Sequence, residues 1–311
     1  MRKILLIGAG KSSSYLVKYL SDHSQAENWE VIVADADQIH AETITAKLPN
    51  CIPVAFNATD EKEREQYIKD SDIVISLLPA SLHSLIAYDC LTYGKSLLTA
   101  SYTSPEIKDL SAAVKDAGLL FLTEMGLDPG IDHMSAKKII DTVHDEGGTV
   151  SVFKSYCGGL VAKESDDNPW NYKISWNPRN VVLAGQGTAR YLDGGTMHYL
   201  PYHRVFSQIE KIKVPGDETY DAYVNRDSLK YIEPYGIKEA QTVIRGTLRH
   251  KGFCKKWNCL VALGVTDDTV VIEDATNLTY RQFVQSFLPS KVSVEDFLWK
   301  TFEIEKGDKE Y

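Results

Sequence analysis

The chain has 311 residues, enough for two or three domains, and its composition (43% hydrophobic, 25% charged) is that of a folded globular protein. Its formal net charge of -9 and its lack of long Lys/Arg blocks argue against nucleic acid or an anionic membrane surface as a partner. No apolar run is long enough to span a membrane, and the N-terminus lacks a signal-peptide pattern, so we expect a cytoplasmic protein. Scattered cysteines and histidines without metal-ligand spacing predict reduced thiols and no metal.

The first 125 residues alternate between short apolar runs and segments with helical spacing. The predicted strands are residues 4–7, 31–34, 51–57, 73–78, 96–99 and 119–122. The predicted helices are residues 15–20, 42–48, 61–68, 82–93 and 106–117. Because the strands are apolar on both faces, the pattern predicts an α/β fold with a doubly wound parallel sheet of the Rossmann type.

The pattern changes after residue 127. A helix at 132–145 and a strand at 150–156 precede a region rich in Gly, Pro, Trp and Tyr with strand-like pieces at 197–200 and 205–214. Four helices are predicted from residue 238 onward, at 239–248, 254–262, 280–287 and 294–302. We therefore predict a Rossmann domain (residues 1–127), an α+β substrate-binding and dimerisation domain with a mixed sheet (residues 128–237) and a partial helical domain (residues 238–311).

The turn after the first strand reads Gly8-x-Gly10-x-x-Ser13 and opens a helix. A dinucleotide needs its pyrophosphate near backbone N–H groups at a helix N-terminus. Gly8 permits the tight turn, Gly10 lets the main chain approach the phosphates, and Ser13 is small where helix meets strand. The turn predicts dinucleotide binding, with an ordinary glycine turn as the alternative.

Asp35 stands at the end of the second predicted strand. A carboxylate there is expected to accept hydrogen bonds from the adenine ribose hydroxyls and to repel a 2′-phosphate. No arginine follows it, so this position predicts NAD rather than NADP. A solvated aspartate at the end of a strand is the alternative.

Two further loops should lie at the carboxyl edge of the sheet, where such folds bind ligands. They contain Ser101 and Tyr102 after the fifth strand, and Leu127, Asp128 and Pro129 after the sixth. Position at this edge predicts a site without specifying its chemistry.

Several of these segments resemble one family. They are Thr99-Ala100-Ser101-Tyr102, the segment GLDPGIDH at 126–133, and residues 155–160, 168–179, 225–228 and 239–249. The chain is similar in these segments to the glutamate-forming saccharopine dehydrogenases, also called saccharopine reductases. The resemblance implies that saccharopine is interconverted with L-glutamate and 2-aminoadipate 6-semialdehyde by hydride transfer, in lysine metabolism. It also favours NADP, against the indication from Asp35.

The resemblance also implies roles for individual residues. Implied saccharopine contacts are Ser101, Tyr102, Asp128, Arg226, Thr247, Leu248 and Arg249. Beside Gly8 and Gly10 of the turn, the implied nucleotide contacts are Lys11, Ser12, Ser13, Ser14, Asp35, Leu127, Asp128, Pro129 and Trp176. The candidate catalytic residues are Asp128 and, as groups whose chemistry allows proton transfer, Tyr102 and Cys157. Each of the two arginines can grip a substrate carboxylate with a bidentate fork, although either could instead form a surface ion pair.

Other interpretations stay open at this stage. Asp128 could hold the substrate amine or merely cap the helix that follows it. Another reductive condensation, of the carboxynorspermidine or homospermidine type, would need an acidic amine pocket in place of Arg226 and Arg249. A non-catalytic NAD-binding regulatory protein is a third possibility. Family members are longer, so we expect a truncated helical domain and, from an uncovered apolar face, a homodimer.

Overall fold

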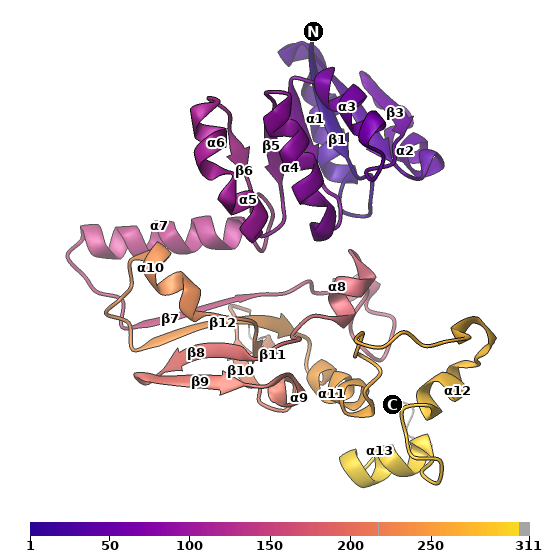
Figure 1. The fold of residues 1–311 in the computed structure, drawn as a ribbon. Helices are drawn as coiled ribbons and strands as arrows, with labels where there is room; N and C mark the ends of the chain where they lie inside the picture. The colour runs from indigo at the N-terminus through magenta and orange to yellow at the C-terminus, as the bar shows by residue number, and fades with distance from the viewer. Residues whose placement is uncertain (217, 305–311) are drawn as a thin grey trace. The chain divides into compact units, whose positions relative to one another are not determined.

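The computed structural model describes residues 1–216 and 218–304, in two units that divide at Ser135 and Ala136 (Figure 1). The N-terminal unit contains a parallel sheet with the strand order β3-β2-β1-β4-β5-β6. Its strands are β1 Arg2–Ile7, β2 Trp29–Asp35, β3 Cys51–Ala55, β4 Ile73–Ser76, β5 Ser96–Thr99 and β6 Phe121–Leu122. This order is that of a Rossmann fold, and it confirms the predicted doubly wound sheet.

Helices cover both faces of this sheet. They are α1 Ser14–Glu27, α2 Gln38–Thr45, α3 Glu61–Lys69, α4 His83–Thr92, α5 Pro105–Asp109 and α6 Ser111–Asp116. In β1, Leu5 and Ile7 pack in the core beneath α3 and α4, whereas Ile4 and Leu6 pack beneath α1 and α2. Burial on both faces explains why the strand is a continuous apolar run instead of an alternating one.

Two of the differences between the predicted and the observed helices concern α2 and the segment 106–117. The helix predicted at 42–48 begins earlier because the Asp37 carboxylate accepts the His40 N–H and caps α2. The helix predicted at 106–117 is interrupted at Leu110, which separates α5 from α6.

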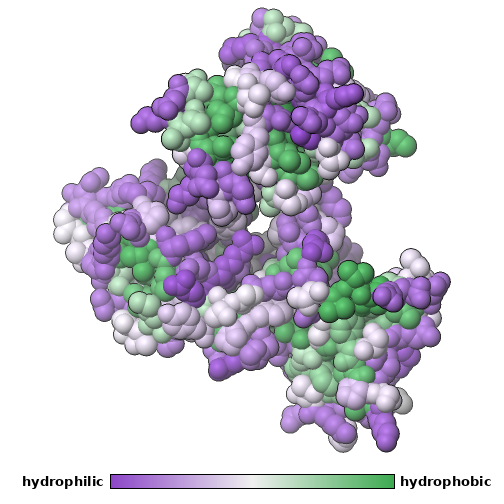
Figure 2. All heavy atoms as spheres, in the orientation of Figure 1, coloured by the Kyte–Doolittle hydropathy of each residue, from purple (hydrophilic) through white to green (hydrophobic). Residues whose placement is uncertain are grey.

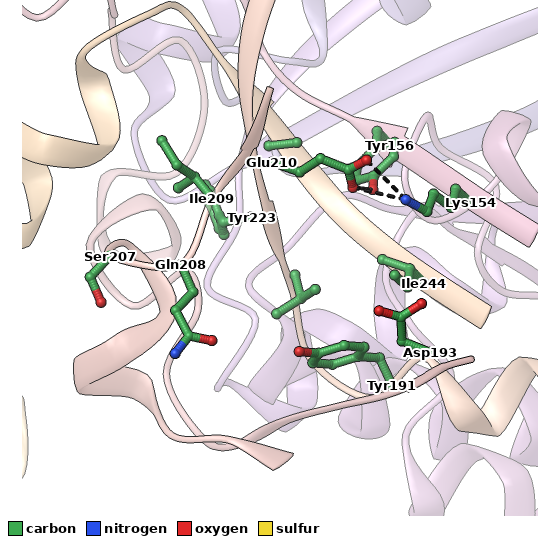
Figure 3. A pocket seen from close by; sticks show the side chains of 12 residues that line it. Lys154, Tyr156, Tyr191, Asp193, Ser207, Gln208, Ile209, Glu210, Tyr223 and Ile244 are labelled. Carbon is green, nitrogen blue, oxygen red and sulfur yellow. Dashed lines mark hydrogen bonds and ion pairs between the residues drawn. The ribbon is translucent and has the colours of Figure 1, made fainter. Parts of the chain in front are cut away.

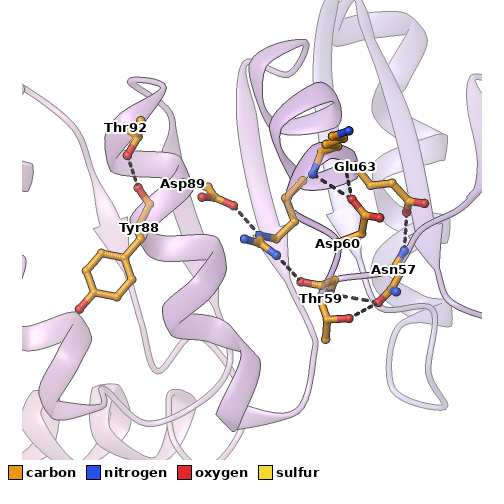
Figure 4. A network of polar contacts seen from close by, with 10 residues as sticks. Asn57, Thr59, Asp60, Glu63, Tyr88, Asp89 and Thr92 are labelled. Atoms are coloured by element: carbon orange, nitrogen blue, oxygen red, sulfur yellow. Dashed lines mark hydrogen bonds and ion pairs between the residues drawn. The ribbon is translucent and has the colours of Figure 1, made fainter.

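A buried ion pair joins α3 to α4. Arg64 Nε lies 2.6 Å from Asp89 Oδ2, and its Nη1 donates to the Ala58 carbonyl at 3.0 Å. Figure 4 shows Asp89 in this network, with Asp60 and Asn57 on the neighbouring turns. Since Arg64 is only 7% exposed, removing its partner would leave a charge in the core.

The C-terminal unit contains a mixed sheet with the order β10-β11-β12-β8-β9, and β7 pairs in parallel with β12. The strands are β7 Val152–Cys157, β8 Ala189–Asp193, β9 Thr196–Leu200, β10 Glu210–Lys213, β11 Thr219–Val224 and β12 Thr242–Arg249. The mixed sheet predicted for this part of the chain is confirmed.

The helix predicted at residues 239–248 is wrong, because this segment is the strand β12 at the centre of the sheet. Arg245 and Arg249 are four residues apart and mimic a helical stripe, but both side chains are buried. The β-branched residues Thr242, Val243 and Ile244 favour a strand, and pairing with β7 and β11 fixes it. The sheet therefore continues past residue 237, where the sequence predicted a helical domain to begin.

The strand predicted at 205–214 is also corrected: Val205 ends the short helix α9 Tyr202–Val205, and only β10 is a strand. The remaining helices are α7 Ile131–Asp145, α8 Pro178–Val182, α10 Ile232–Tyr235, α11 Phe253–Leu263, α12 Tyr280–Gln285 and α13 Val294–Phe302.

The last two helices leave apolar side chains exposed, and Figure 2 shows apolar residues on the surface of this part of the chain. Tyr280 and Trp299 are 94% and 57% exposed. Among the described residues, no helix has the length and apolar composition needed to cross a bilayer.

Candidate functional site

The glycine turn between β1 and α1 is built as the sequence predicts. Gly8 has φ +103°, and a Cβ there would lie 3.0 Å from the Leu77 carbonyl carbon and oxygen, so only glycine fits. A Cβ at Gly10 would meet no atom within 4 Å, so the backbone is open to a ligand at that point. This matches the different roles expected of the two glycines in holding a pyrophosphate.

Asp35 fastens this turn to the end of β2. Its Oδ2 accepts the Ala9 N–H at 2.7 Å, and its Oδ1 accepts the Asp37 N–H at 2.9 Å. Ser13 is fully buried, and its hydroxyl donates to the Gly10 carbonyl at 2.7 Å. Asp35 therefore stabilises the glycine turn. The ribose contact that the sequence predicted for it stays a prediction.

The described residues fit a dinucleotide. Lys11, Ser12 and Ser14 are exposed at the start of α1, a helix of 14 residues. Its first N–H groups and the positive end of its dipole favour a phosphate. The Lys11 and Ser12 contacts remain predictions, as does the contact of Ser14.

At the carboxyl edge of the same sheet, the structure brings Tyr102 and Asp128 together. The Tyr102 hydroxyl donates to Asp128 Oδ1 at 2.8 Å, although the residues are 26 positions apart. Both follow strands: Tyr102 comes after β5 and Asp128 after β6. This hydrogen bond gives Asp128 a partner other than the helix N-terminus that was the alternative.

The loop that carries Leu127, Asp128 and Pro129 is tightly closed. The Gly126 N–H donates to the Pro129 carbonyl at 2.9 Å, and the Asp128–Pro129 peptide is cis. Gly130 has φ +150°, and a Cβ there would lie 2.0 Å from the Gly126 oxygen. The loop thus requires glycine at 130 and presents the three residues on a fixed backbone.

In the C-terminal unit, Thr247, Leu248 and Arg249 lie at the end of β12. Cys157, at the end of β7, is the register partner of Thr247. The structure therefore brings these four predicted site residues together on adjacent strands.

Arg249 is buried at 6% exposure among aromatic rings. Its guanidinium carbon lies 4.8 Å from the Tyr172 ring centre and 5.2 Å from that of Phe253. Nη1 donates to the Leu248 carbonyl at 3.2 Å, while Nε is buried and has no hydrogen-bond partner within the described part of the chain. A buried guanidinium with an unused donor is suited to an anionic ligand.

Arg226 is exposed and has a left-handed backbone, with φ +56°. Its carbonyl accepts the Arg190 N–H at 2.8 Å, and the Arg190 carbonyl accepts the Ser228 N–H at 2.8 Å. Arg190 Nη1 also pairs with Asp227 at 3.1 Å. These hydrogen bonds attach the loop at residues 226–228 to β8 and so fix the position of the Arg226 backbone.

Asn225 is a residue that the sequence analysis did not assign to the site. Its Nδ2 donates to Thr247 Oγ1 at 3.2 Å, and its N–H donates to the Arg245 carbonyl at 3.0 Å. It thereby links the Arg226 loop to β12. Its place directly before Arg226 in a segment of family resemblance was the available signal.

Trp176, which was predicted to contact the nucleotide, is 41% exposed in the segment that precedes α8.

A pocket of about 470 Å³ on the sheet of the C-terminal unit is lined by none of the predicted site residues (Figure 3). There Lys154 Nζ pairs with Glu210 at 2.9 Å, and Tyr156 donates to the same carboxylate at 2.9 Å. Burial and this hydrogen bond raise the pKa of Tyr156. Within the described residues, no cluster of His, Cys, Asp and Glu could hold a metal.

The fold and this geometry define a two-unit protein with a Rossmann dinucleotide-binding domain and a mixed-sheet domain that carries a buried arginine. The model of the saccharopine dehydrogenase NADP binding domain matches residues 4–122, and that of the saccharopine dehydrogenase C-terminal domain matches residues 126–310. The chain therefore belongs to the saccharopine dehydrogenase family, and its nucleotide is of the NAD(P) type.

Several curated relatives and a solved structure agree with this assignment. The chain is 34% identical over 310 residues to "Saccharopine dehydrogenase [NADP(+), L-glutamate-forming]" of Schizosaccharomyces pombe, covering 98% of this chain and 68% of that protein. It is 36% identical over 288 residues to mitochondrial alpha-aminoadipic semialdehyde synthase of Mus musculus, covering 91% of this chain and 31% of that protein. The apo saccharopine dehydrogenase (L-Glu forming) of Saccharomyces cerevisiae superposes with a TM-score of 0.80 at 31% identity, covering 92% of this chain and 64% of that one.

Proposed function

We propose that this chain is an oxidoreductase that interconverts saccharopine with L-glutamate and 2-aminoadipate 6-semialdehyde, in lysine metabolism. The relatives described above, which are named as glutamate-forming saccharopine dehydrogenases, support this reaction. The geometric observation that carries the proposal is the Tyr102–Asp128 hydrogen bond at the carboxyl edge of the Rossmann sheet. Ligands bind at that edge in doubly wound sheets.

The glycine turn and the start of α1 would hold the nucleotide, and a bound nicotinamide would supply the hydride acceptor for the lysine-derived methylene carbon next to the secondary amine. Asp128 binds the amine, because a carboxylate stabilises the positive charge that develops as the amine becomes an iminium. Water then adds to the imine carbon, and the carbon–nitrogen bond breaks to release glutamate and the aldehyde. Tyr102 orients Asp128 through its hydroxyl and is placed to relay a proton to it. Cys157 is the second candidate for proton transfer.

Arg249 and Arg226 bind carboxylates of saccharopine in this proposal. Arg249 supplies a guanidinium that is already desolvated, which strengthens its interaction with an anion. Thr247 and Ser101 supply hydroxyl groups, and Leu248 supplies main-chain groups.

For the cofactor we propose NADP(H). The NADP-dependent relative from Schizosaccharomyces pombe and the match of residues 4–122 to an NADP binding domain favour NADP(H), against the NAD preference that Asp35 predicted. Asp35 accepts hydrogen bonds from the Ala9 and Asp37 N–H groups, so an acid at this position has a structural role that does not depend on the choice between NAD and NADP.

The polyamine-type condensation is less favoured, since the position of Arg249 offers a buried cation where a polyamine substrate needs an acid. A non-catalytic nucleotide-binding role would show itself as binding of the cofactor without its reduction.

The test is to mix the full chain with saccharopine and either NADP or NAD, and to follow the absorbance of reduced nicotinamide together with released glutamate. We expect turnover with NADP preferred. Arg249→Gln should raise the KM for saccharopine by about tenfold or more, the usual cost of removing a charged hydrogen-bond partner. Arg281→Gln, at an exposed ion pair with Glu295, is the matched control and should leave KM unchanged. Binding of both nucleotides with reduction of neither would contradict the proposed reaction.

A further inference from the structure

His83 is a buried imidazole at the first position of α4, and no role was assigned to it from the sequence. It is 2% exposed. Its Nδ1 lies 2.9 Å from the Ser76 hydroxyl at the end of β4. Its Nε2 lies 2.8 Å from the Ser101 hydroxyl and 3.1 Å from that of Thr99 at the end of β5. One side chain thus connects two strand ends to a residue of the proposed substrate site.

Burial lowers the pKa of His83 to about 4, so the imidazole is neutral near neutral pH and one ring nitrogen carries the proton. The short contact between Nε2 and the Ser101 oxygen needs a hydrogen atom between the two. Either Nε2–H donates to Ser101, or Ser101 donates to a bare Nε2.

Counting the buried hydroxyl groups separates these two arrangements. If Nε2 carries the proton, Ser76 donates to Nδ1, Thr99 lies 3.5 Å from the same nitrogen, and the hydroxyl hydrogen left without an acceptor among the described residues is that of Ser101, which is only half-buried. If Nδ1 carries the proton and Ser101 donates to Nε2, the hydroxyl hydrogen of the fully buried Ser76 is left without an acceptor among the described residues. A fully buried donor without an acceptor is costly, whereas the half-buried Ser101 hydroxyl can meet water or a ligand, so the first arrangement is favoured.

The first arrangement has a consequence for Ser101. Because Ser101 accepts the Nε2–H, its own hydroxyl hydrogen cannot point toward His83 and is available to a ligand. Ser101 is then a hydrogen-bond donor, the polarity that a carboxylate oxygen requires and an ammonium group rejects.

We propose that His83 is a positioning residue: its imidazole donates Nε2–H to Ser101 and thereby fixes the Ser101 hydroxyl as a donor to a carboxylate of the substrate. This inference rests on the proposed function, because it takes saccharopine as the ligand of Ser101. It assigns His83 no contact with substrate and no proton transfer.

Two variants of similar polarity separate this role from a structural one. In His83→Gln the side-chain amide nitrogen can reach the position of Nε2 and keep the donor. In His83→Asn the shorter amide reaches only the position of Nδ1. We expect His83→Asn to raise the KM for saccharopine by about tenfold, the effect of one lost hydrogen bond, with a smaller change in kcat and an unchanged affinity for NADPH. His83→Gln should stay within about threefold of the wild type in KM.

The double variant tests whether His83 acts through Ser101. In a Ser101→Ala background, His83→Asn should produce no further rise in KM, because its target is gone. An equal rise in both backgrounds would overturn the proposal, as would a parallel loss of NADPH affinity, which indicates a general distortion of the Rossmann unit.

A measurement that needs no turnover keeps the proposal separate from the proposed function. The nitrogen NMR signals of the His83 ring in the wild-type chain should report a neutral imidazole protonated at Nε2. A proton on Nδ1 would refute the assigned polarity of Ser101 even if the enzyme is active. Failure of the wild-type chain to turn over saccharopine would refute the proposed function and, with it, the substrate contact, whereas the ring protonation would still be determined.

Discussion

The acid sensitivity of the N-terminal unit is expected to depend on His83. Burial lowers the pKa of this imidazole from 6.5 to about 4 in the folded chain. Below pH 6.5 the unfolded chain therefore binds a proton that the folded chain does not, and the free energy of unfolding falls as pH falls. The loss begins near the unfolded pKa and is complete near the folded one; below that, both states are protonated.

The size of the effect follows from the pKa difference. Each unit corresponds to about 1.4 kcal/mol, so the full shift amounts to about 3 kcal/mol. Between roughly pH 7 and pH 4.5 the expected contribution is about 2 kcal/mol. Carboxylates also titrate in this range, so the contribution of His83 is the difference between the wild type and a variant without the imidazole.

The assay is urea unfolding of the full chain at several pH values, with wild type and His83→Gln compared. The wild type should lose about 2 kcal/mol more than the variant over that interval. His23→Gln removes an exposed imidazole of the same unit and is the matched control, which should follow the wild type. If His83→Gln loses as much stability on acidification as the wild type, His83 is not buried as a neutral group and the reasoning fails.

Three further predictions concern other contacts. Tyr102→Phe removes the donor to Asp128, and kcat for saccharopine oxidation should fall by about tenfold or more in steady-state assays, with NADPH affinity unchanged in a fluorescence titration. Asp35→Asn loses the charge that holds the glycine turn, so titrations should show weaker binding of both NADPH and NADH; loss of NADH binding alone would instead indicate a ribose contact as its main role. Asp89→Ala leaves Arg64 buried without its carboxylate and should lower the free energy of unfolding in urea by about 3 kcal/mol; a loss below about 1 kcal/mol would show that water reaches the guanidinium.

The Rossmann unit could be predicted from the amino-acid sequence alone. The signals for this unit are local. They are apolar runs such as residues 4–7, a turn that requires glycine at position 8, and Asp35 at the end of β2. Because each parallel strand is buried on both faces, its sequence shows its environment without knowledge of its neighbours. The family segments likewise predicted Tyr102, Asp128 and Arg249 as site residues, and their roles stay predictions.

Other features depend on contacts between segments that are far apart in the sequence. The segment 239–248 has residues compatible with either a helix or a strand, and pairing with β7 and β11 makes it β12. Asp35 acts on Ala9, and His83 connects to Ser101, through contacts between strand ends that are distant in sequence. Hydrogen bonds of this kind require donor and acceptor to be placed to within a few tenths of an ångström, which residue types and spacing do not specify.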